Sequence, residues 1–271
     1  MFIYSLNKQE IMKQVEIEKD LAKKIWEQEE ELLEQELEKL GKLEDHTVEF
    51  SCHPELYDKN LFSGERCVTE KMIDSREFTK DWHLPFPECK DYIQKEIDRR
   101  FQNRCLTYFD NSYPLRCIFG STISGFFSYK MECNTKYDKP HEKLFFVQTI
   151  FCTAYYALKF MGKFYDFLDL NSKIKMSFNI SDTLNRIPVR KLDKKMGYNP
   201  IRFYGGEFIK HPKISFSLVT TYNEISSTPN EVTFDLIKQF NTFISPNISD
   251  EELHSLIKKM GNGDLTAFEC S

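Results

Sequence analysis

The first long pattern along the chain is helical and covers residues 8–44. The segment contains no proline, its glycine is Gly41 near the end, and Glu, Lys, Gln and Leu dominate it. Trp26, Leu33 and Leu40 recur at seven-residue spacing, but Glu30 breaks the second heptad position, so a coiled coil is indicated only in part. The pattern predicts one long amphipathic helix whose apolar stripe packs either on the rest of the chain or on a partner chain.

The remainder of the chain alternates between strand and helix patterns. Strands are predicted near residues 46–52, 67–72, 115–120, 126–133, 173–180 and 214–221, the clearest being 173–180, where Ile, Met and Phe alternate with Lys, Ser and Asn. A hairpin turn is predicted at 204–207. Helices are predicted at 87–106, 141–169, 231–244 and from Ser249, where a capping box begins, to Gly261.

These elements predict an α+β fold. Strands that follow one another in groups favour a mostly antiparallel sheet packed by helices, preceded by the long acidic N-terminal helix. The predicted organisation is a long charged amphipathic helix at 1–45 and an α+β domain at 46–271.

Charge is distributed unevenly along the 271 residues, whose formal net charge is −5. Residues 8–45 carry seven lysines against thirteen acids, so the rest of the chain is close to neutral. With 41% hydrophobic and 14% aromatic residues, the chain can build a substantial core, and composition excludes collagen-like and low-complexity classes.

The cysteines and the N-terminus favour a reduced, intracellular setting, most simply the cytoplasm. Eight cysteines are present, but no secretory signal pattern precedes them and a chain of this length needs no disulfide staples. The most apolar run, 144–158, is shorter than a membrane-spanning helix requires and contains Gln and Thr. We therefore expect no membrane segment.

Motifs that carry chemistry are mostly missing. Gly120 to Gly125 has the spacing of a phosphate loop, but Phe126 and Phe127 replace the Lys and Ser/Thr that such a loop needs, which favours a strand-connecting turn. No C-x-x-C pair occurs, so no metal site and no cofactor are predicted. Glu88 and Lys90 resemble half of a nuclease site, but in a first helical turn a glutamate is equally expected.

The strongest functional signal is a basic segment at 186–213. Eight Lys and Arg face only Asp193 and Glu207, and aromatic residues lie between them. Positive charge contacts phosphates and exposed aromatic rings stack on bases, so the segment predicts nucleic-acid binding; an acidic protein surface, including the chain's own N-terminal helix, and a plain solvated hairpin are the alternatives. The predicted nucleic-acid-binding residues are Arg186, Arg190, Lys191, Lys194, Lys195, Tyr198, Arg202, Tyr204, Lys210 and Lys213.

The sequence favours a non-enzymatic interaction protein. The basic segment binds nucleic acid or an acidic surface, and the N-terminal helix binds a partner or a second copy through Trp26, Leu33, Leu37 and Leu40. The alternatives are a metal-dependent nuclease or phosphate-ester hydrolase whose carboxylates converge only in the fold, and a structural subunit of a larger complex.

Overall fold

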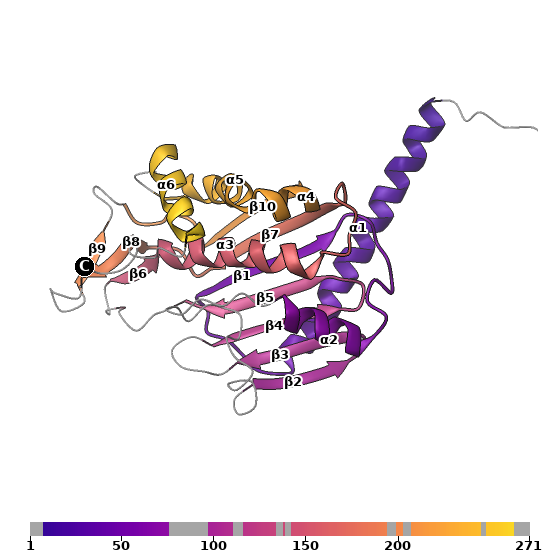
Figure 1. The fold of residues 1–271 in the computed structure, drawn as a ribbon. Helices are drawn as coiled ribbons and strands as arrows, with labels where there is room; N and C mark the ends of the chain where they lie inside the picture. Colours follow the sequence, from indigo (N-terminus) through magenta and orange to yellow (C-terminus); the bar gives the residue numbers. More distant parts are fainter. Residues whose placement is uncertain are drawn as a thin grey trace, which may run out of the picture.

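A computed structural model of the chain describes residues 8–75, 97–110, 116–133, 138, 142–193, 199–202, 207–244 and 248–262 (Figure 1). In chain order the elements are α1 (Lys8–Glu38), β1 (Thr47–Pro54), α2 (Glu65–Asp74), β2 (Ile97–Gln102), β3 (Cys105–Asp110), β4 (Cys117–Thr122), β5 (Phe127–Glu132), β6 (Lys143–Phe146), α3 (Val147–Phe164), β7 (Lys173–Ser181), β8 (Arg186–Asp193), β9 (Asn199–Arg202), β10 (Lys213–Thr221), α4 (Tyr222–Ser227), α5 (Pro229–Asn241) and α6 (Asp250–Gly261).

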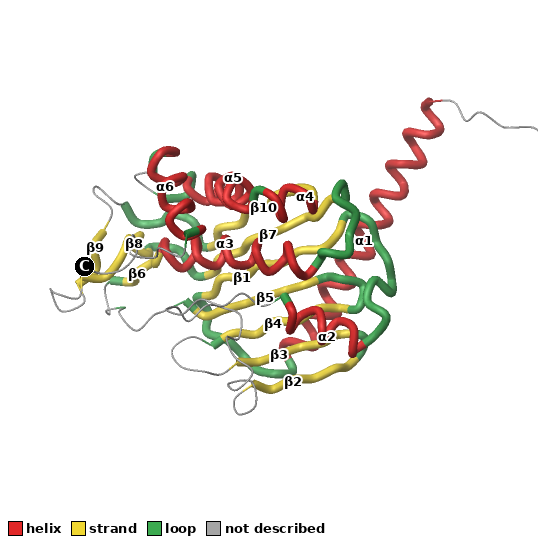
Figure 2. The backbone as a smooth tube through the Cα atoms, in the orientation of Figure 1, coloured by secondary structure: helices red, strands yellow, loops and turns green. Residues whose placement is uncertain are grey.

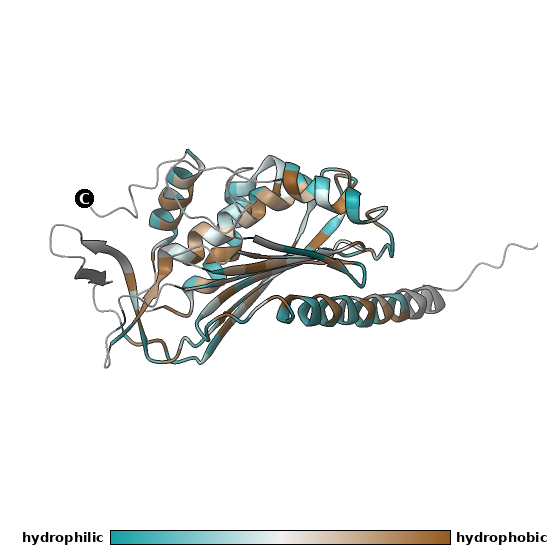
Figure 3. Cartoon of the chain, turned by 90° about the horizontal axis from the view of Figure 1, so that it is seen from below, coloured by the Kyte–Doolittle hydropathy of each residue, from teal (hydrophilic) through white to brown (hydrophobic). Residues whose placement is uncertain are grey.

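Seven strands form an antiparallel sheet in the order β10-β7-β1-β5-β4-β3-β2. The other helices pack on one face of this sheet and α1 lies on the opposite face, so the molecule has three layers (Figures 2 and 3). The predicted α+β class, with a mostly antiparallel sheet and a preceding acidic helix, is confirmed. The division into parts at 1–45 and 46–271 stays a prediction.

The main core lies between the sheet and the helices α3, α5 and α6. Alternate residues of β7 illustrate the pattern: Ile174, Met176, Phe178 and Ile180 are buried in this core, whereas the residues between them face the side of α1. Helix α3 is buried on most of its circumference, as its long apolar run predicts. Burial of aromatic and aliphatic side chains on this scale is the dominant stabilising term.

Helix α1 packs on the other face of the sheet, where small side chains let the helix approach the strands closely. Opposed pairs run across the strands from Ser51 through Ser128 and Gly120 to Thr107. A Cβ atom at Gly120 would lie 3.1 Å from Leu33 Cδ1, so the backbone of β4 supports the helix directly. The apolar stripe of α1 therefore packs on the chain's own sheet from Trp26 to Leu40.

A second, three-stranded sheet is formed by β6, β8 and β9, with β6 parallel to β8. Arg186, the first residue of β8, is almost completely buried and holds this sheet in place. The guanidinium donates to Asp138 Oδ2 at 2.9 Å, to the Leu144 carbonyl at 3.0 Å and to Asp182 Oδ2 at 2.7 Å. Burial opposes ionisation of Asp182, but the hydrogen bond from Arg186 together with the positive charges of Arg186 and Lys143 lowers the pKa of that carboxyl.

Three sequence predictions of secondary structure are wrong. The predicted helix at 87–106 contains the β2–β3 hairpin from residue 97 onward, with Asn103 and Arg104 at φ values of 49° and 66° in a two-residue turn; residues 87–96 lie outside the described part. The strand predicted at 67–72 is helix α2. The helix predicted at 141–169 is shorter, because 143–146 pairs with β8 as strand β6.

Other predictions are confirmed. The turn between Gly120 and Gly125 connects β4 to β5, as expected, and Gly125 occupies a φ of 88° there. The six cysteines within the described residues are free thiols; Cys89 and Cys270 lie outside that part, as does most of the predicted hairpin turn at 204–207. Within the described residues, no helix is both long and apolar enough to cross a membrane.

Candidate binding groove between helix α1 and the sheet

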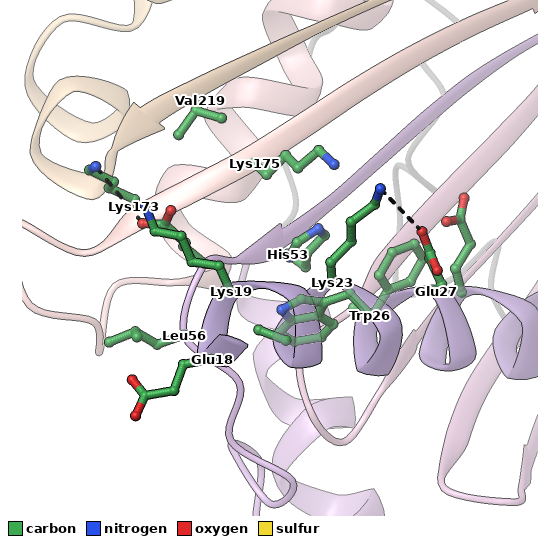
Figure 4. A pocket seen from close by; sticks show the side chains of 14 residues that line it. Glu18, Lys19, Lys23, Trp26, Glu27, His53, Leu56, Lys173, Lys175 and Val219 are labelled. Atoms are coloured by element: carbon green, nitrogen blue, oxygen red, sulfur yellow. Dashed lines mark ion pairs between the residues drawn. The ribbon is translucent and has the colours of Figure 1, made fainter. Parts of the chain in front are cut away.

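A groove lies between the N-terminal half of α1 and the ends of β1, β7 and β10 (Figure 4). Its volume is about 600 Å³. We call it the α1 groove. Its lining residues are Glu18, Lys19, Ala22, Lys23, Trp26, Glu27, Glu30, His53, Glu55, Leu56, Phe126, Lys173, Lys175 and Val219.

Sheet register explains why these residues meet. In β1, His53 is directly opposite Lys175 of β7, which in turn is opposite Val219 of β10. This row of side chains faces α1. Trp26 lies at the inner end, where the apolar stripe of the helix first becomes buried, and the groove opens from there toward β10.

Aromatic rings form the inner end of the groove. The rings of Trp26 and His53 stack with centroids 4.4 Å apart, and Phe126 lies 5.9 Å from His53 on the same stack. His53 Nδ1 lies 2.8 Å from the Pro54 carbonyl, which can only accept, so Nδ1 carries the hydrogen. Burial lowers the pKa of His53 to about 4, and the ring is therefore neutral at pH 7 with Nε2 as an acceptor.

Cations and carboxylates alternate around the opening. Lys23 pairs with Glu27 and Lys173 with Glu55, each at 3.9 Å. Lys19 on α1 and Lys175 on β7 form no ion pair with any described residue. These two ammonium groups stand on opposite walls of the α1 groove, as Figure 4 shows. Lys175 also attracts the Glu30 carboxylate across the groove and, against the effect of burial, acts to lower the pKa of that carboxyl, so an anion placed between the walls would share Lys175 with Glu30.

A carboxylate cluster borders the inner wall. Lys130 of β5 pairs with Glu34 of α1 and with Glu49 of β1, the latter at 3.4 Å. Burial, followed by repulsion from Glu34, raises the pKa of the neighbouring groove residue Glu30. The pKa of Glu49 is raised by burial as well, although Lys130 acts against it. The cluster is already neutralised in part by Lys130, and no group of three metal-ligating side chains is found among the described residues.

A buried carboxylate fixes the helix wall in place. Glu29 of α1 accepts hydrogen bonds from Ser124 Oγ at 2.5 Å, Tyr57 Oη at 3.0 Å and Arg104 Nη1 at 3.2 Å. About two turns further along, Glu36 accepts from Asn103 and Lys39 at 2.7 and 2.6 Å. Acids of α1 are thus satisfied by the chain's own sheet and turns, which holds the groove in one geometry.

The predicted partner-binding residues Trp26, Leu33, Leu37 and Leu40 lie in the interface between α1 and the sheet, where all four are buried. A partner that used them would have to displace the helix from the sheet. Binding of a partner through the helix stays a prediction. The large apolar side chains of α1 that are exposed to a partner are Ile17, at 68% exposure, and Leu21, at 57%, both nearer the N-terminus.

The structure describes only some of the predicted nucleic-acid-binding residues, and those it describes do not form one cluster. Arg186 is buried in its aspartate cluster, Lys210 pairs with Glu207 at 2.9 Å, and Lys213 is exposed at the start of β10. Arg190 and Lys191 lie on β8 and Arg202 on β9, but the structure describes only their backbone. Lys194, Lys195, Tyr198 and Tyr204 lie outside the described residues.

Sequence reasoning did not find the α1 groove. Its residues come from α1, three strands and a turn, and only the pairing register brings His53, Lys175 and Val219 into one row. The available signal was the alternation in 173–180, which placed Lys175 on the face away from the core. Comparison with protein-family models, with curated proteins and with solved structures finds no match to this chain.

Proposed function

We propose that this chain is a binding protein whose α1 groove takes an amphipathic anion, a ligand with an apolar body and a single carboxylate or phosphate group. The observation that carries the proposal is the pair Lys19 and Lys175, two ammonium groups without described ion-pair partners on opposite walls of an aromatic-ended groove. A volume of about 600 Å³ suits a small organic ligand.

The apolar body has surfaces to contact. The edges of Trp26 and Phe126 lie at the inner end, while Leu56 and Val219 are exposed at the outer end. Contact of a ligand with these side chains removes apolar area from water, which favours binding at roughly 25 cal/mol per Å². Lys19 and Lys175 then orient the anionic group at the opening.

The carboxylates around the groove select against polyanions. Glu18, Glu27, Glu30 and Glu55 all line it, so a chain of phosphates passing through would meet like charge repeatedly. A ligand with one anionic group avoids them. For this reason nucleic acid is the less favoured occupant of this groove, and the nucleic-acid hypothesis stays with the basic segment at 186–213.

A direct test uses Trp26 as the reporter. In a Trp82→Phe background Trp26 is the remaining tryptophan, and 1-anilinonaphthalene-8-sulfonate serves as an amphipathic anionic probe. We expect saturable quenching of Trp26, and at least fivefold weaker binding for Lys19→Glu and for Lys175→Glu. Lys24→Glu is the matched control, because it changes charge on the same helix outside the groove lining and should leave the affinity unchanged.

Two results would count against the proposal. Equal affinity for Lys19→Glu, Lys175→Glu and the control would show that the probe binds elsewhere. Displacement of the probe by a single-stranded 12-nucleotide DNA, at concentrations where dodecanoate does not displace it, would assign the groove to polyanions instead.

A further inference from the structure

The outer edge of β10 carries backbone groups that point away from the sheet. Tyr222 N–H donates to the Ser172 carbonyl at 2.8 Å, one residue pair beyond Thr221 and Lys173, where the β10–β7 register ends. In an antiparallel pair, residues that bond to the neighbouring strand alternate with residues that point outward. The outward set is therefore Ser215, Ser217 and Val219, together with the terminal residues Lys213 and Thr221.

No described strand occupies that edge, because β10 ends the seven-stranded order. It is also unusually long for an open edge, with nine residues. Natural edges are commonly guarded by proline, by charged side chains or by bulges. Between Ile214 and Thr221 there is neither proline nor charge, and the β10–β7 register runs without a shift. An edge of this kind is suited to pairing with another strand.

Helix α1 supplies the second observation. Every side chain from Glu16 to Leu21 is exposed, and α1 extends beyond the rest of the molecule at the corner where β10 ends (Figure 1). The part at 8–21, which we call the arm, is about 21 Å long at 1.5 Å per residue. An isolated helix of about this length gains little stability in water. Ile17 and Leu21 face away from the groove lining on this arm and are largely exposed.

We propose that two copies of this chain associate through antiparallel pairing of their β10 strands about a two-fold axis at Ser217, with each arm contacting the other copy. This pairing sets Ser217 opposite Ser217 of the second copy, Ser215 opposite Val219 and Lys213 opposite Thr221. The only charge on the strand thus meets a neutral residue, so the sequence is complementary to itself. The three central pairs contribute about six hydrogen bonds.

The arm fits the same arrangement. Val219 and Lys19 line one groove, so α1 passes beside the Val219 end of β10. Pairing brings Ser215 of the second copy next to Val219, and the arm continues toward that copy. Both the open edge and the projecting helix are then accounted for by one occupant, and the sheet becomes continuous across the two copies.

The test measures mass and self-affinity of the full-length chain by light scattering and sedimentation. We expect a species of twice 32.2 kDa. Ser217→Lys should weaken association at least tenfold, because like charges then oppose each other across the axis, and added salt should restore part of it. Ser215→Lys is the matched control: it places the same charge on the same exposed face but opposite Val219, so its effect should be clearly smaller.

A second variant tests the backbone bonds. Ser217→Pro removes an N–H that points outward, so pairing with β7 is preserved while pairing with a second copy is blocked. We expect a monomer with unchanged circular dichroism. A monomeric wild-type chain at 100 μM overturns the proposal, as does equal dimerisation of Ser217→Lys and wild type. Loss of the dimer in Ile17→Glu/Leu21→Glu, with both Ser217 variants still dimeric, would assign association to the arm alone and also overturn it.

Discussion

Two imidazoles, the buried His46 and the half-buried His53, make the stability of this fold depend on pH. The ring of His46 is held by a 2.8 Å hydrogen bond from Nδ1 to the Ser181 carbonyl, and that of His53 by the stack with Trp26. Burial lowers the pKa of each to about 4. An unfolded histidine has a pKa near 6.5, so between pH 6.5 and 4 the unfolded chain binds more protons than the folded one.

The free energy of unfolding should therefore be highest above pH 6.5 and fall as the pH drops toward 4, by up to about 3 kcal/mol for each histidine. Glu30 and Glu49 act in the opposite sense, because their raised pKa values let the folded state take up protons more readily as the pH falls. Urea unfolding at pH 7 and pH 5 measures the net slope. His53→Phe, which keeps an aromatic ring on Trp26, should make it shallower.

The matched control is His254→Phe. His254 is exposed and stacks on Phe234 with ring centroids 3.7 Å apart, so this variant makes the same substitution at a histidine outside the α1 groove. If His53→Phe and His254→Phe give the same slope as wild type, the neutral burial of His53 is wrong.

At the scale of elements, helix α1 packs closely on strand β4 because Gly120 of that strand has no side chain. A Cβ atom at Gly120 would come within 2.6 Å of the Leu106 carbonyl oxygen and 3.1 Å of Leu33 Cδ1. The first contact is with backbone of the neighbouring strand and has little room to adjust. Gly120→Ala should therefore destabilise the chain by about 1–3 kcal/mol and increase amide exchange along α1. Denaturant unfolding and hydrogen exchange check the two effects.

Gly162 provides the comparison within the same molecule. It lies inside α3, and a Cβ there would make an ordinary 3.5 Å contact with Ile225. Since alanine is the better helix former, Gly162→Ala should be neutral or stabilising by up to about 1 kcal/mol. Similar losses for both alanine variants would contradict the steric role assigned to Gly120.

Elements with a single strong periodicity were predictable from sequence, and those fixed by contacts were not. The helix predicted at 8–44 is present as α1, although it ends at Glu38, and the strand predicted at 173–180 is present as β7. In 97–105, by contrast, Ile97, Phe101 and Cys105 fit a helical period. The hairpin turn there depends on positive φ values at Asn103 and Arg104, and an arginine in the sequence does not indicate a positive φ. The α1 groove escaped prediction for the same reason, because strand register alone opposes His53 and Lys175.

At the scale of the whole molecule, the net charge of −5 combines an acidic N-terminal helix with a basic segment at 186–213. Acids of α1 are paired within the chain: Glu29 with Arg104, Glu34 with Lys130 and Glu36 with Lys39. Among the described residues, none of these cations comes from the basic segment at 186–213. Where the structure describes the side chains of the segment's cations, Arg186 pairs with Asp138 and Asp182 and Lys210 pairs with Glu207, none of them an acid of α1.

The nucleic-acid hypothesis for this segment makes a quantitative prediction. If Arg190, Lys191, Lys194 and Lys195 contact phosphates, each contributes to counterion release. Reversing all four to Glu should then reduce the slope of log K against log salt by about 3 for a single strand and weaken binding at low salt at least 100-fold. A fluorescent 20-nucleotide RNA measures both quantities. The control reverses four exposed lysines elsewhere, Lys24, Lys42, Lys59 and Lys259. Because this control has the same net charge, equal losses in the two proteins would indicate a non-specific charge effect. A loss confined to the segment variant would instead place the phosphate contacts on β8 and the residues that follow it.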